Sequence, residues 1–494
     1  MLELSTPSHA ADWLRARVRG TLHADSRRIG VGDGFIAWPG AATDGRTHVP
    51  SALSQGAAAC LVEKTGVEPF GFDHPNIAVY ERLKPATGPI AAEFFKRPTE
   101  QLDVLAVTGT NGKTSTSWWL AQALSRLARP LPCALVGTLG MGRPPALEFS
   151  GLTTPDPVML QQQFRRFVEQ GMQACAIEAS SIGIAERRLD GCRIRVAIFT
   201  NFTQDHLDYH GSMEAYWQAK AELFHWPQLQ SAVINIDDAQ GVQLAATLAG
   251  RGLDLWTVSC MQPARLRALE IGNGDDGLGF SVREGERQCR LNTGLIGQYN
   301  VSNLLGVLAA MRSLGVSLDD AVQACHGLLP VPGRMERLSH PGAPLVAVDY
   351  AHTPDALDKA LQALRPLASE RGGLLWCVFG CGGDRDATKR PLMAAVCEKN
   401  ADRVVVTSDN PRFEKPEAII SQILLGLSRD DSVQVEADRA CAIAQAIAQA
   451  APADVVLIAG KGAEQHQEIA GVKLPFSDQA HARAALNARK AVGA

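Results

Sequence analysis

A glycine-rich segment ending in Lys113 and Thr114 has the clearest chemical potential in this sequence. The apolar run 102–107 is followed by Thr108-Gly-Thr-Asn-Gly-Lys-Thr114 and then by a helical pattern. Glycines let backbone N–H groups approach an anion, and the start of a helix adds partial positive charge. Lys113 could reach the outer phosphates of a nucleotide, and Thr114 could bind magnesium. Val107 occupies the first glycine position of GxxxxGK[ST], so we interpret the segment as a shortened phosphate-binding loop.

Two further polar clusters come directly after apolar runs that read as strands. Glu178 follows 174–177, and a segment containing His206 follows 196–199. A carboxylate and an imidazole beside a phosphate-binding loop can position magnesium, directly or through water. Either residue alone would be an ordinary turn residue, but together they indicate a metal site. Lys220 lies in a helical stretch, where a lone lysine is normally solvated.

The last third of the sequence carries charged residues that could recognise an amino acid. Phe379-Gly-Cys-Gly-Gly-Asp-Arg-Asp386 is followed by Arg390, and Arg385 or Arg390 could bind a carboxylate in bidentate fashion. Asp409-Asn-Pro-Arg412 follows another apolar run and suits a zwitterion, with ammonium on the aspartate and carboxylate on the arginine. An Asn-Pro turn is the simpler reading of the same residues.

The elements that must position these residues alternate between strands and helices. The sequence of 494 residues is too long for one core. We expect a small N-terminal α/β domain (1–97), a central P-loop ATPase-like domain with a parallel sheet (98–332) and a C-terminal Rossmann-like domain (333–494). Residues 265–295 look different and could form a small antiparallel insert. In such folds, ligands bind at the carboxyl ends of the strands.

Composition excludes several classes of function. A net charge of −4 gives no basic field for nucleic acid. No run of 18 apolar residues occurs, so we expect no membrane span, and the N-terminus does not read as a secretory signal. Eleven scattered cysteines lack zinc spacing and suggest reduced thiols in the cytosol. We expect a cytoplasmic monomer.

Taken together, these segments resemble the Mur ligases, ATP-dependent enzymes that add amino acids to peptidoglycan precursors. The resemblance covers essentially the whole chain and rests on nine motifs: TGTNGKT (108–114), EASS (178–181), TNFTQDHLDYHGS (200–212), GQYNVSN (297–303), PGRME (332–336), DYAHTPDAL (349–357), FGCGGDRD (379–386), DNPR (409–412) and GKG (460–462). DNPR is the family's signature for meso-diaminopimelate rather than L-lysine.

The resemblance implies the substrates ATP, UDP-N-acetylmuramoyl-L-Ala-D-Glu and meso-diaminopimelate, with Mg²⁺ as cofactor. ATP is expected at Gly109, Thr110, Asn111, Gly112, Lys113, Thr114, Asn300, Asn303, Arg334 and Asp349. The UDP-linked substrate is expected at Ser26, Thr153, Thr154, Ser180, Glu186 and Arg188. Diaminopimelate is expected at Arg390, Asp409, Asn410, Pro411, Arg412, Gly460 and Glu464. Magnesium is expected at Thr114, Glu178, His206 and Lys220.

Lys220 matches the family's carbamylated lysine, and Lys113, His206 and Lys220 are the expected catalytic residues. An ammonium about 5 Å from a divalent cation would be repelled by about 6–7 kcal/mol at an effective dielectric near 20. Reaction of the neutral amine with CO2 gives an anion instead, which can bind the metal.

Three positions depart from the family pattern. Ala463 replaces a common histidine, Glu186 stands where glutamine is common, and Ala41-Ala-Thr43 replaces a polar stretch expected near the uridine. Three alternatives stay open: ligation of L-lysine, folylpolyglutamate synthesis, and a P-loop protein that only switches on nucleotide.

Overall fold

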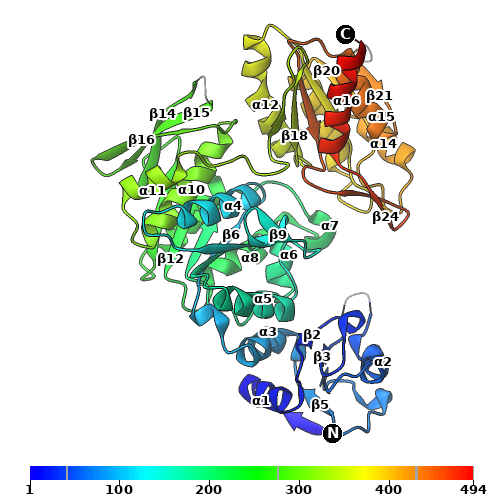
Figure 1. Ribbon diagram of the computed structural model, residues 1–494. Coiled ribbons are helices and arrows are strands. Elements are labelled where there is room, and N and C mark those ends of the chain that lie inside the picture. Colours follow the sequence, from blue (N-terminus) through cyan, green and yellow to red (C-terminus); the bar gives the residue numbers. More distant parts are fainter. Residues whose placement is uncertain (41–42, 275–276, 429–431, 493–494) are drawn as a thin grey trace.

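The computed structural model describes residues 1–40, 43–274, 277–428 and 432–492. Three sheets, each flanked by helices, follow one another along the chain (Figure 1). Ala41 and Ala42, on which one of the family departures falls, lie outside the described residues. None of the described helices is long and apolar enough to cross a bilayer.

The first sheet is fully parallel, with strand order β1-β5-β4-β3-β2. Its strands are β1 (Leu2–Leu4), β2 (Leu22–His23), β3 (Gly34–Ala37), β4 (Ala59–Glu63) and β5 (Ile77–Tyr80). Its helices are α1 (Pro7–Arg17), α2 (Val49–Ser54) and α3 (Leu83–Phe94). Every residue of β3, β4 and β5 is buried, as expected for parallel strands covered on both faces.

The central sheet has the strand order β16-β15-β14-β13-β12-β11-β6-β10-β7-β8-β9. Strands β14, β13, β12, β11, β6, β10 and β7 run parallel, and antiparallel hairpins extend both edges. The strands are β6 (Asp103–Thr108), β7 (Cys133–Gly137), β8 (Gly140–Arg143), β9 (Ala146–Glu148), β10 (Ala174–Glu178), β11 (Val196–Phe199), β12 (Ser231–Asn235), β13 (Asp254–Ser259), β14 (Leu266–Gly274), β15 (Gly277–Glu284) and β16 (Arg287–Thr293). The last three confirm the expected antiparallel insert.

Two apolar cores sandwich the central sheet. One packs α4 (Lys113–Ser125), α10 (Tyr299–Ser313) and α11 (Leu318–Cys325) against one face. The other includes α5 (Pro157–Glu169) and α9 (Ala239–Leu248). Short helices α6 (Ser181–Ala185), α7 (Leu207–His210) and α8 (Met213–Ala221) follow β10 and β11. The helix that follows the phosphate loop is therefore fixed by burial along most of its length.

The third sheet has the order β17-β18-β22-β19-β20-β21 and is parallel except at β17. Its strands are β17 (Glu336–Leu338), β18 (Leu345–Asp349), β19 (Leu375–Phe379), β20 (Arg403–Val406), β21 (Val433–Val435) and β22 (Val455–Ala459). Helices α12 (Pro354–Glu370), α13 (Lys389–Asn400) and α14 (Pro416–Leu424) cover one face; α15 (Arg439–Gln449) and α16 (Asp478–Val492) cover the other. A hairpin of β23 (His466–Ile469) and β24 (Val472–Pro475) follows β22. The α/β class predicted for all three parts is confirmed.

Candidate functional site

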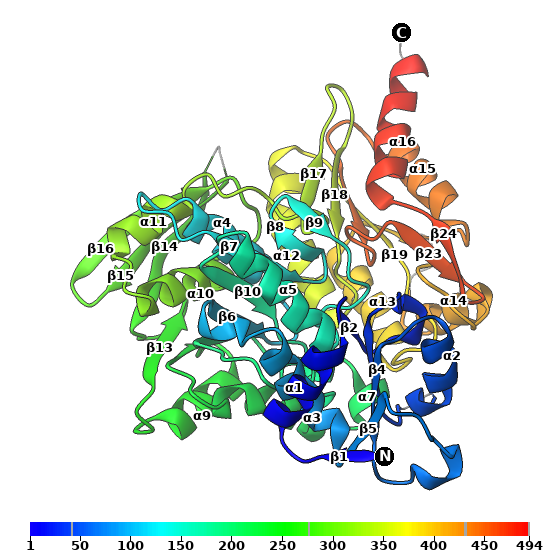
Figure 2. The ribbon, with the colours of Figure 1, turned by 60° about the horizontal axis from the view of Figure 1, so that its bottom comes forward.

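One cavity of about 1320 Å³ collects residues from the central and C-terminal sheets. It is lined by the phosphate loop, by residues after β10, β11 and β18, and by the segment after β22. The polar motifs come together because each follows the carboxyl end of a parallel strand, where doubly wound sheets bind ligands. In Figure 2 the central domain lies on the left and the third domain on the right, and Asn111 of the phosphate loop donates to Asp355 at the start of α12.

The phosphate loop is shaped by two glycines between β6 and α4. Gly109 has a φ of +145° and Gly112 a φ of +86°, conformations that side chains rarely adopt. A Cβ at Gly109 would collide with Thr200 Oγ1, and one at Gly112 with Asn303 Oδ1. The loop is thus pressed against its neighbours, and Thr110, Asn111, Gly112, Lys113 and Thr114 line the cavity.

Two lysines donate to the same carbonyl of this loop. Lys113 Nζ lies 2.8 Å from the Gly109 oxygen and 2.9 Å from the Thr110 oxygen. Lys220 Nζ lies 2.7 Å from the Gly109 oxygen and 4.4 Å from the centre of the Tyr216 ring. Burial lowers the pKa of Lys113, and burial together with the charge of Lys113 holds the pKa of Lys220 well below its ordinary value. Both effects shift Lys220 toward the neutral amine relative to an exposed lysine.

Glu178 and Thr114 place oxygen ligands at the start of α4. Thr114 Oγ1 donates to Glu178 Oε2 at 3.0 Å, and Thr138 donates its N–H to Glu178 Oε1 at 2.8 Å. Among the described residues, no group of three or more His, Cys, Asp or Glu side chains could hold a metal ion by itself. The pair nevertheless fits Mg²⁺, which commonly takes one or two carboxylates and completes its shell with water and substrate phosphates.

His206 lines the same cavity and lies beside a buried carboxylate. Its backbone φ is +53°, and its Nε2 lies 3.4 Å from Asp205 Oδ2. Burial lowers the pKa of His206 to about 3, because desolvation and two nearby lysines outweigh Asp205. Burial alone would raise the pKa of Asp205, but the hydrogen bond and charge of His352 hold it well below its usual range. The imidazole is neutral at physiological pH, the form that binds metals.

The four residues expected near ATP beyond the loop also line the cavity. These are Asn300, Asn303, Arg334 and Asp349. Arg334 Nη2 donates to Thr114 Oγ1 at 3.1 Å, and its guanidinium lies 4.2 Å from the centre of the Tyr350 ring. Arg334 therefore connects the third sheet's domain to the phosphate loop.

The expected contacts for the UDP-linked substrate divide into two groups. Thr153, Ser180 and Arg188 line the cavity. Thr154 is fully buried and donates to the Glu178 carbonyl at 2.7 Å, which gives it a structural position behind Ser180. Ser26 and Glu186 do not line the cavity; Glu186 accepts from Tyr209 and pairs with Lys84 of α3 at 2.8 Å.

The residues expected at the amino acid divide in the same way. Asn410, Arg412 and Glu464 line the cavity, whereas Asp409, Pro411 and Gly460 do not. Gly460 has a φ of +117°, and a Cβ there would lie 2.5 Å from Asp409 Oδ2. Asp409 and Pro411 belong to the backbone turn that presents Asn410 and Arg412, and Gly460 packs against Asp409.

Arg390, also expected at diaminopimelate, does not line the cavity, and its assignment stays a prediction. Its side chain is 1% exposed and lies outside the cavity lining. The guanidinium donates to Glu414 at 2.8 Å and to Gln422 at 2.7 Å. Arg385 lines the cavity instead and is half-exposed. The spacing of charges in the sequence could not distinguish the two arginines.

Lys461 was missed, although it lies in the GKG motif. It is fully buried, and its Nζ lies 2.9 Å from Asn410 Oδ1 and 2.8 Å from Glu464 Oε2. A lysine between two glycines directly after a buried strand was the signal that could have identified it. His352, in the DYAHTPDAL motif, was also missed and lines the cavity.

Comparison with known proteins agrees with this geometry. The Mur ligase middle domain matches residues 107–311, and the Mur ligase glutamate ligase domain matches residues 333–462. A protein of Acidovorax sp. (strain JS42), named UDP-N-acetylmuramoyl-L-alanyl-D-glutamate--2,6-diaminopimelate ligase, is 64% identical, covering 99% of each chain. A protein of Janthinobacterium sp. (strain Marseille) with the same name is 47% identical, covering 98% of this chain and 97% of its own.

A solved structure of an enzyme with that name is 35% identical, has a TM-score of 0.64, and covers 95% of each chain. The similarity therefore extends over all three sheets, and this chain belongs to the Mur ligase family of ATP-dependent, amide-bond-forming ligases.

Proposed function

We propose that this chain joins meso-diaminopimelate to the D-Glu γ-carboxylate of UDP-N-acetylmuramoyl-L-Ala-D-Glu, using ATP. The observation that carries this proposal is the shared cavity, which is lined by the phosphate loop and by Asn410, Arg412 and Glu464. The relatives at 64% and 47% identity bear the name of that activity. We also propose domain boundaries at 1–97, 98–332 and 333–494.

The first step is activation of the carboxylate. The γ-carboxylate attacks the γ-phosphorus of ATP, so that an acyl phosphate forms and ADP leaves. Lys113 and the N–H groups at the start of α4 neutralise charge on the transferred phosphoryl group. Mg²⁺ held by Thr114, Glu178 and His206 would neutralise phosphate charge when bound. A carbamate on Lys220 would supply a further anionic ligand.

The second step is formation of the amide. The diaminopimelate amine attacks the acyl carbonyl carbon, phosphate leaves, and the amine loses a proton. The protein's main contribution is to hold the amine against the acyl phosphate. Glu464 can hold an ammonium group of the amino acid, while Arg412 and Arg385 can hold carboxylates.

The alternatives fit the cavity less well. L-lysine lacks the second carboxylate that two arginines can bind, and folylpolyglutamate synthesis uses glutamate with a folate acceptor. A nucleotide switch would give no role to Asn410, Arg412 and Glu464 facing the phosphate loop.

Phosphate release tests the proposal directly. With ATP, Mg²⁺ and UDP-N-acetylmuramoyl-L-Ala-D-Glu, we expect release with meso-diaminopimelate and little with L-lysine. Release with L-lysine but not with meso-diaminopimelate would contradict the proposed amino-acid substrate. Release with glutamate and a folate would favour folylpolyglutamate synthesis, and release without any amino acid would favour a nucleotide switch.

A further inference from the structure

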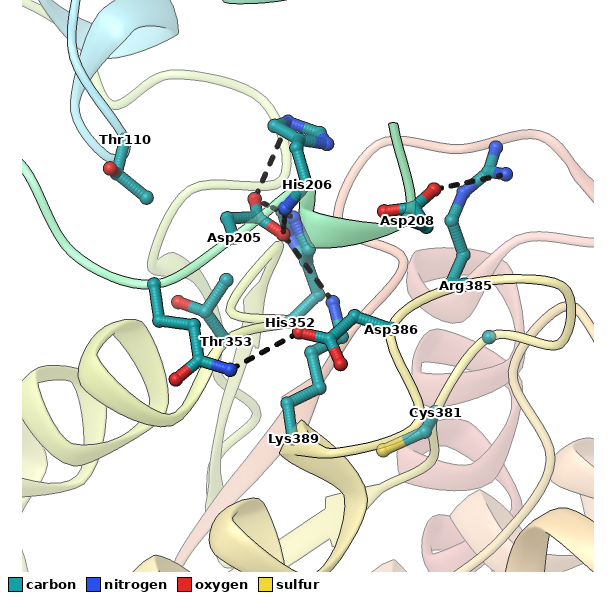
Figure 3. Close-up of polar contacts among 12 residues, drawn as sticks. Thr110, Asp205, His206, Asp208, His352, Thr353, Cys381, Arg385, Asp386 and Lys389 are labelled. Carbon is teal, nitrogen blue, oxygen red and sulfur yellow. Dashed lines mark hydrogen bonds and ion pairs between the residues drawn. The ribbon is translucent and has the colours of Figure 1, made fainter. Parts of the chain in front are cut away.

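The loop after β11 runs along the segment that precedes α13 in the third domain (Figure 3). Gln204 Nε2 donates to Asp386 Oδ2 at 3.2 Å and to Thr388 Oγ1 at 3.1 Å. Asp208 Oδ2 lies 4.0 Å from Arg385 Nη1. The loop that carries His206 thus contacts the amino-acid side at more than one point.

Asp205 is the most buried acid in this contact. Its carboxylate lies 3.6 Å from His352 Nε2 and 3.7 Å from Lys389 Nζ, both of the third domain. Asp205 is 5% exposed and Lys389 7% exposed. Asp205 Oδ1 also accepts the backbone N–H of His206 at 2.9 Å. The Asp205 carboxylate therefore connects His352 and Lys389 of the third domain to His206, which is expected to bind magnesium.

We propose that Asp205 is a positioning residue that sets the amino-acid domain against the phosphate-binding domain through His352 and Lys389. This inference rests on the proposed ligase function. In that reaction the two domains each supply a reactant, and the amine must come within about 3–3.5 Å of the acyl carbon. A misplacement of about 1 Å can cost about 100-fold in rate.

Two further contacts between these domains lie on the phosphate loop. Asn111 Nδ2 donates to Asp355 Oδ2 at 3.0 Å, and Arg334 reaches Thr114. Those contacts tie the third domain to the nucleotide side. Asp205 adds a support next to the loop 385–389, which carries Arg385 into the amino-acid end of the cavity. Its loss should therefore impair the amine step more than the phosphoryl step.

The opposite charges of Asp205 and Lys389 predict that substitutions of the two residues will have non-additive effects on activity. Removal of Asp205 alone leaves the buried Lys389 ammonium without this anion, which is more damaging than removing both charges. Asp205→Asn, Lys389→Met and the double variant form the required cycle. Lys399→Met is the matched control, because Lys399 lies at the far end of the same helix and is exposed.

Two assays separate the two steps. Hydroxylamine, a small nucleophile, traps the acyl phosphate as a hydroxamate without diaminopimelate. We expect Asp205→Asn and Lys389→Met to retain hydroxamate formation within about threefold but to lose amide formation about 10- to 100-fold. The double variant should be no worse than Asp205→Asn, and Lys399→Met should match the unchanged protein. Melting temperatures identify any variant that fails to fold.

The remaining outcomes overturn the inference. Equal losses of hydroxamate and amide would assign Asp205 to the phosphoryl step, and additive losses would remove the coupling to Lys389. Unchanged amide formation in Lys389→Met would contradict the positioning role even if Asp205→Asn did not fold. If the unchanged protein made neither product, the proposed function itself would be wrong, which is distinguishable from these results.

Discussion

Basic side chains have different partners in the central and third domains. In the central domain, Lys113 and Lys220 donate to backbone carbonyls, and among the described residues neither amino group forms an ion pair with a carboxylate. In the third domain, Lys461 pairs with Glu464, Arg390 with Glu414 and Arg439 with Asp478. Basic side chains are thus bound by carbonyl dipoles in the central domain and by charged carboxylates in the third domain.

The difference separates charge attraction from shape recognition. Carbonyl dipoles leave positive charge uncompensated at the phosphate loop, so an incoming polyanion supplies the missing charge. The N-terminus of α4 adds to that attraction. Carboxylates in the third domain remove most of the net charge. Recognition of a zwitterion there must depend on where individual donors and acceptors lie.

The largest effect expected from this comparison is loss of turnover in Lys113→Met. We expect kcat to fall about 1000-fold, equivalent to about 4 kcal/mol of transition-state stabilisation. The melting temperature should stay the same or rise, because the variant removes a partly buried amino group that forms no ion pair with a carboxylate among the described residues. Phosphate release and thermal unfolding measure the two quantities. A fall in melting temperature with turnover preserved would show that Lys113 stabilises the fold rather than serving the reaction.

The second effect is expected in Lys461→Met, on the compensated side. The variant leaves Glu464 Oε2 without its cation and Asn410 Oδ1 without one donor, at a cost of about 1–3 kcal/mol. We expect kcat/KM for diaminopimelate to fall about 30- to 100-fold, while KM for ATP changes less than twofold. In contrast to Lys113→Met, the melting temperature should fall. A larger effect on ATP than on diaminopimelate would contradict the assignment of Lys461 to the amino-acid side.

Arg385 and Arg390 show one limit of prediction from the sequence. The apolar runs predicted β6, β10 and β11 because buried parallel strands are continuously apolar. The phosphate loop followed from its glycines. Arg385 and Arg390 are alike in type and five residues apart, and only the packing of α13 buries Arg390 against Glu414.

A matched pair of variants makes that distinction measurable. Arg385→Met should raise KM for diaminopimelate about 10-fold without changing the melting temperature, because its side chain is half-exposed at the cavity. Arg390→Met should lower the melting temperature and leave KM unchanged, because it removes a buried partner of Glu414. The opposite pattern would support Arg390, as first predicted, as the residue that binds diaminopimelate.

Glu186 shows a second limit of prediction from sequence, which concerns contacts between residues of different domains. Family resemblance placed it at the UDP-linked substrate, yet its carboxylate is occupied by Lys84 and Tyr209. Lys84 lies 102 residues away in the sequence, so no local pattern could reveal the pair. Thr154 was likewise expected at the substrate, and its burial behind Ser180 depends on the packing of α6. Local sequence thus predicted the strand ends, whereas side-chain contacts between distant segments could not be predicted from it.

The smallest effect expected concerns CO2 at Lys220. Because burial and Lys113 lower its pKa, the amine is neutral at a lower pH than an ordinary lysine, and CO2 can form an N-carbamate with release of a proton. We expect CO2-free buffer to lower kcat a few-fold and bicarbonate to restore it, with the loss growing as pH falls through the pKa of Lys220. A carbamate signal in ¹³C NMR with ¹³CO2, absent in Lys220→Ala, gives a readout independent of activity. An unmodified Lys220 in fully active, magnesium-loaded protein would mean that the uncompensated charge at the loop is neutralised by the substrates alone.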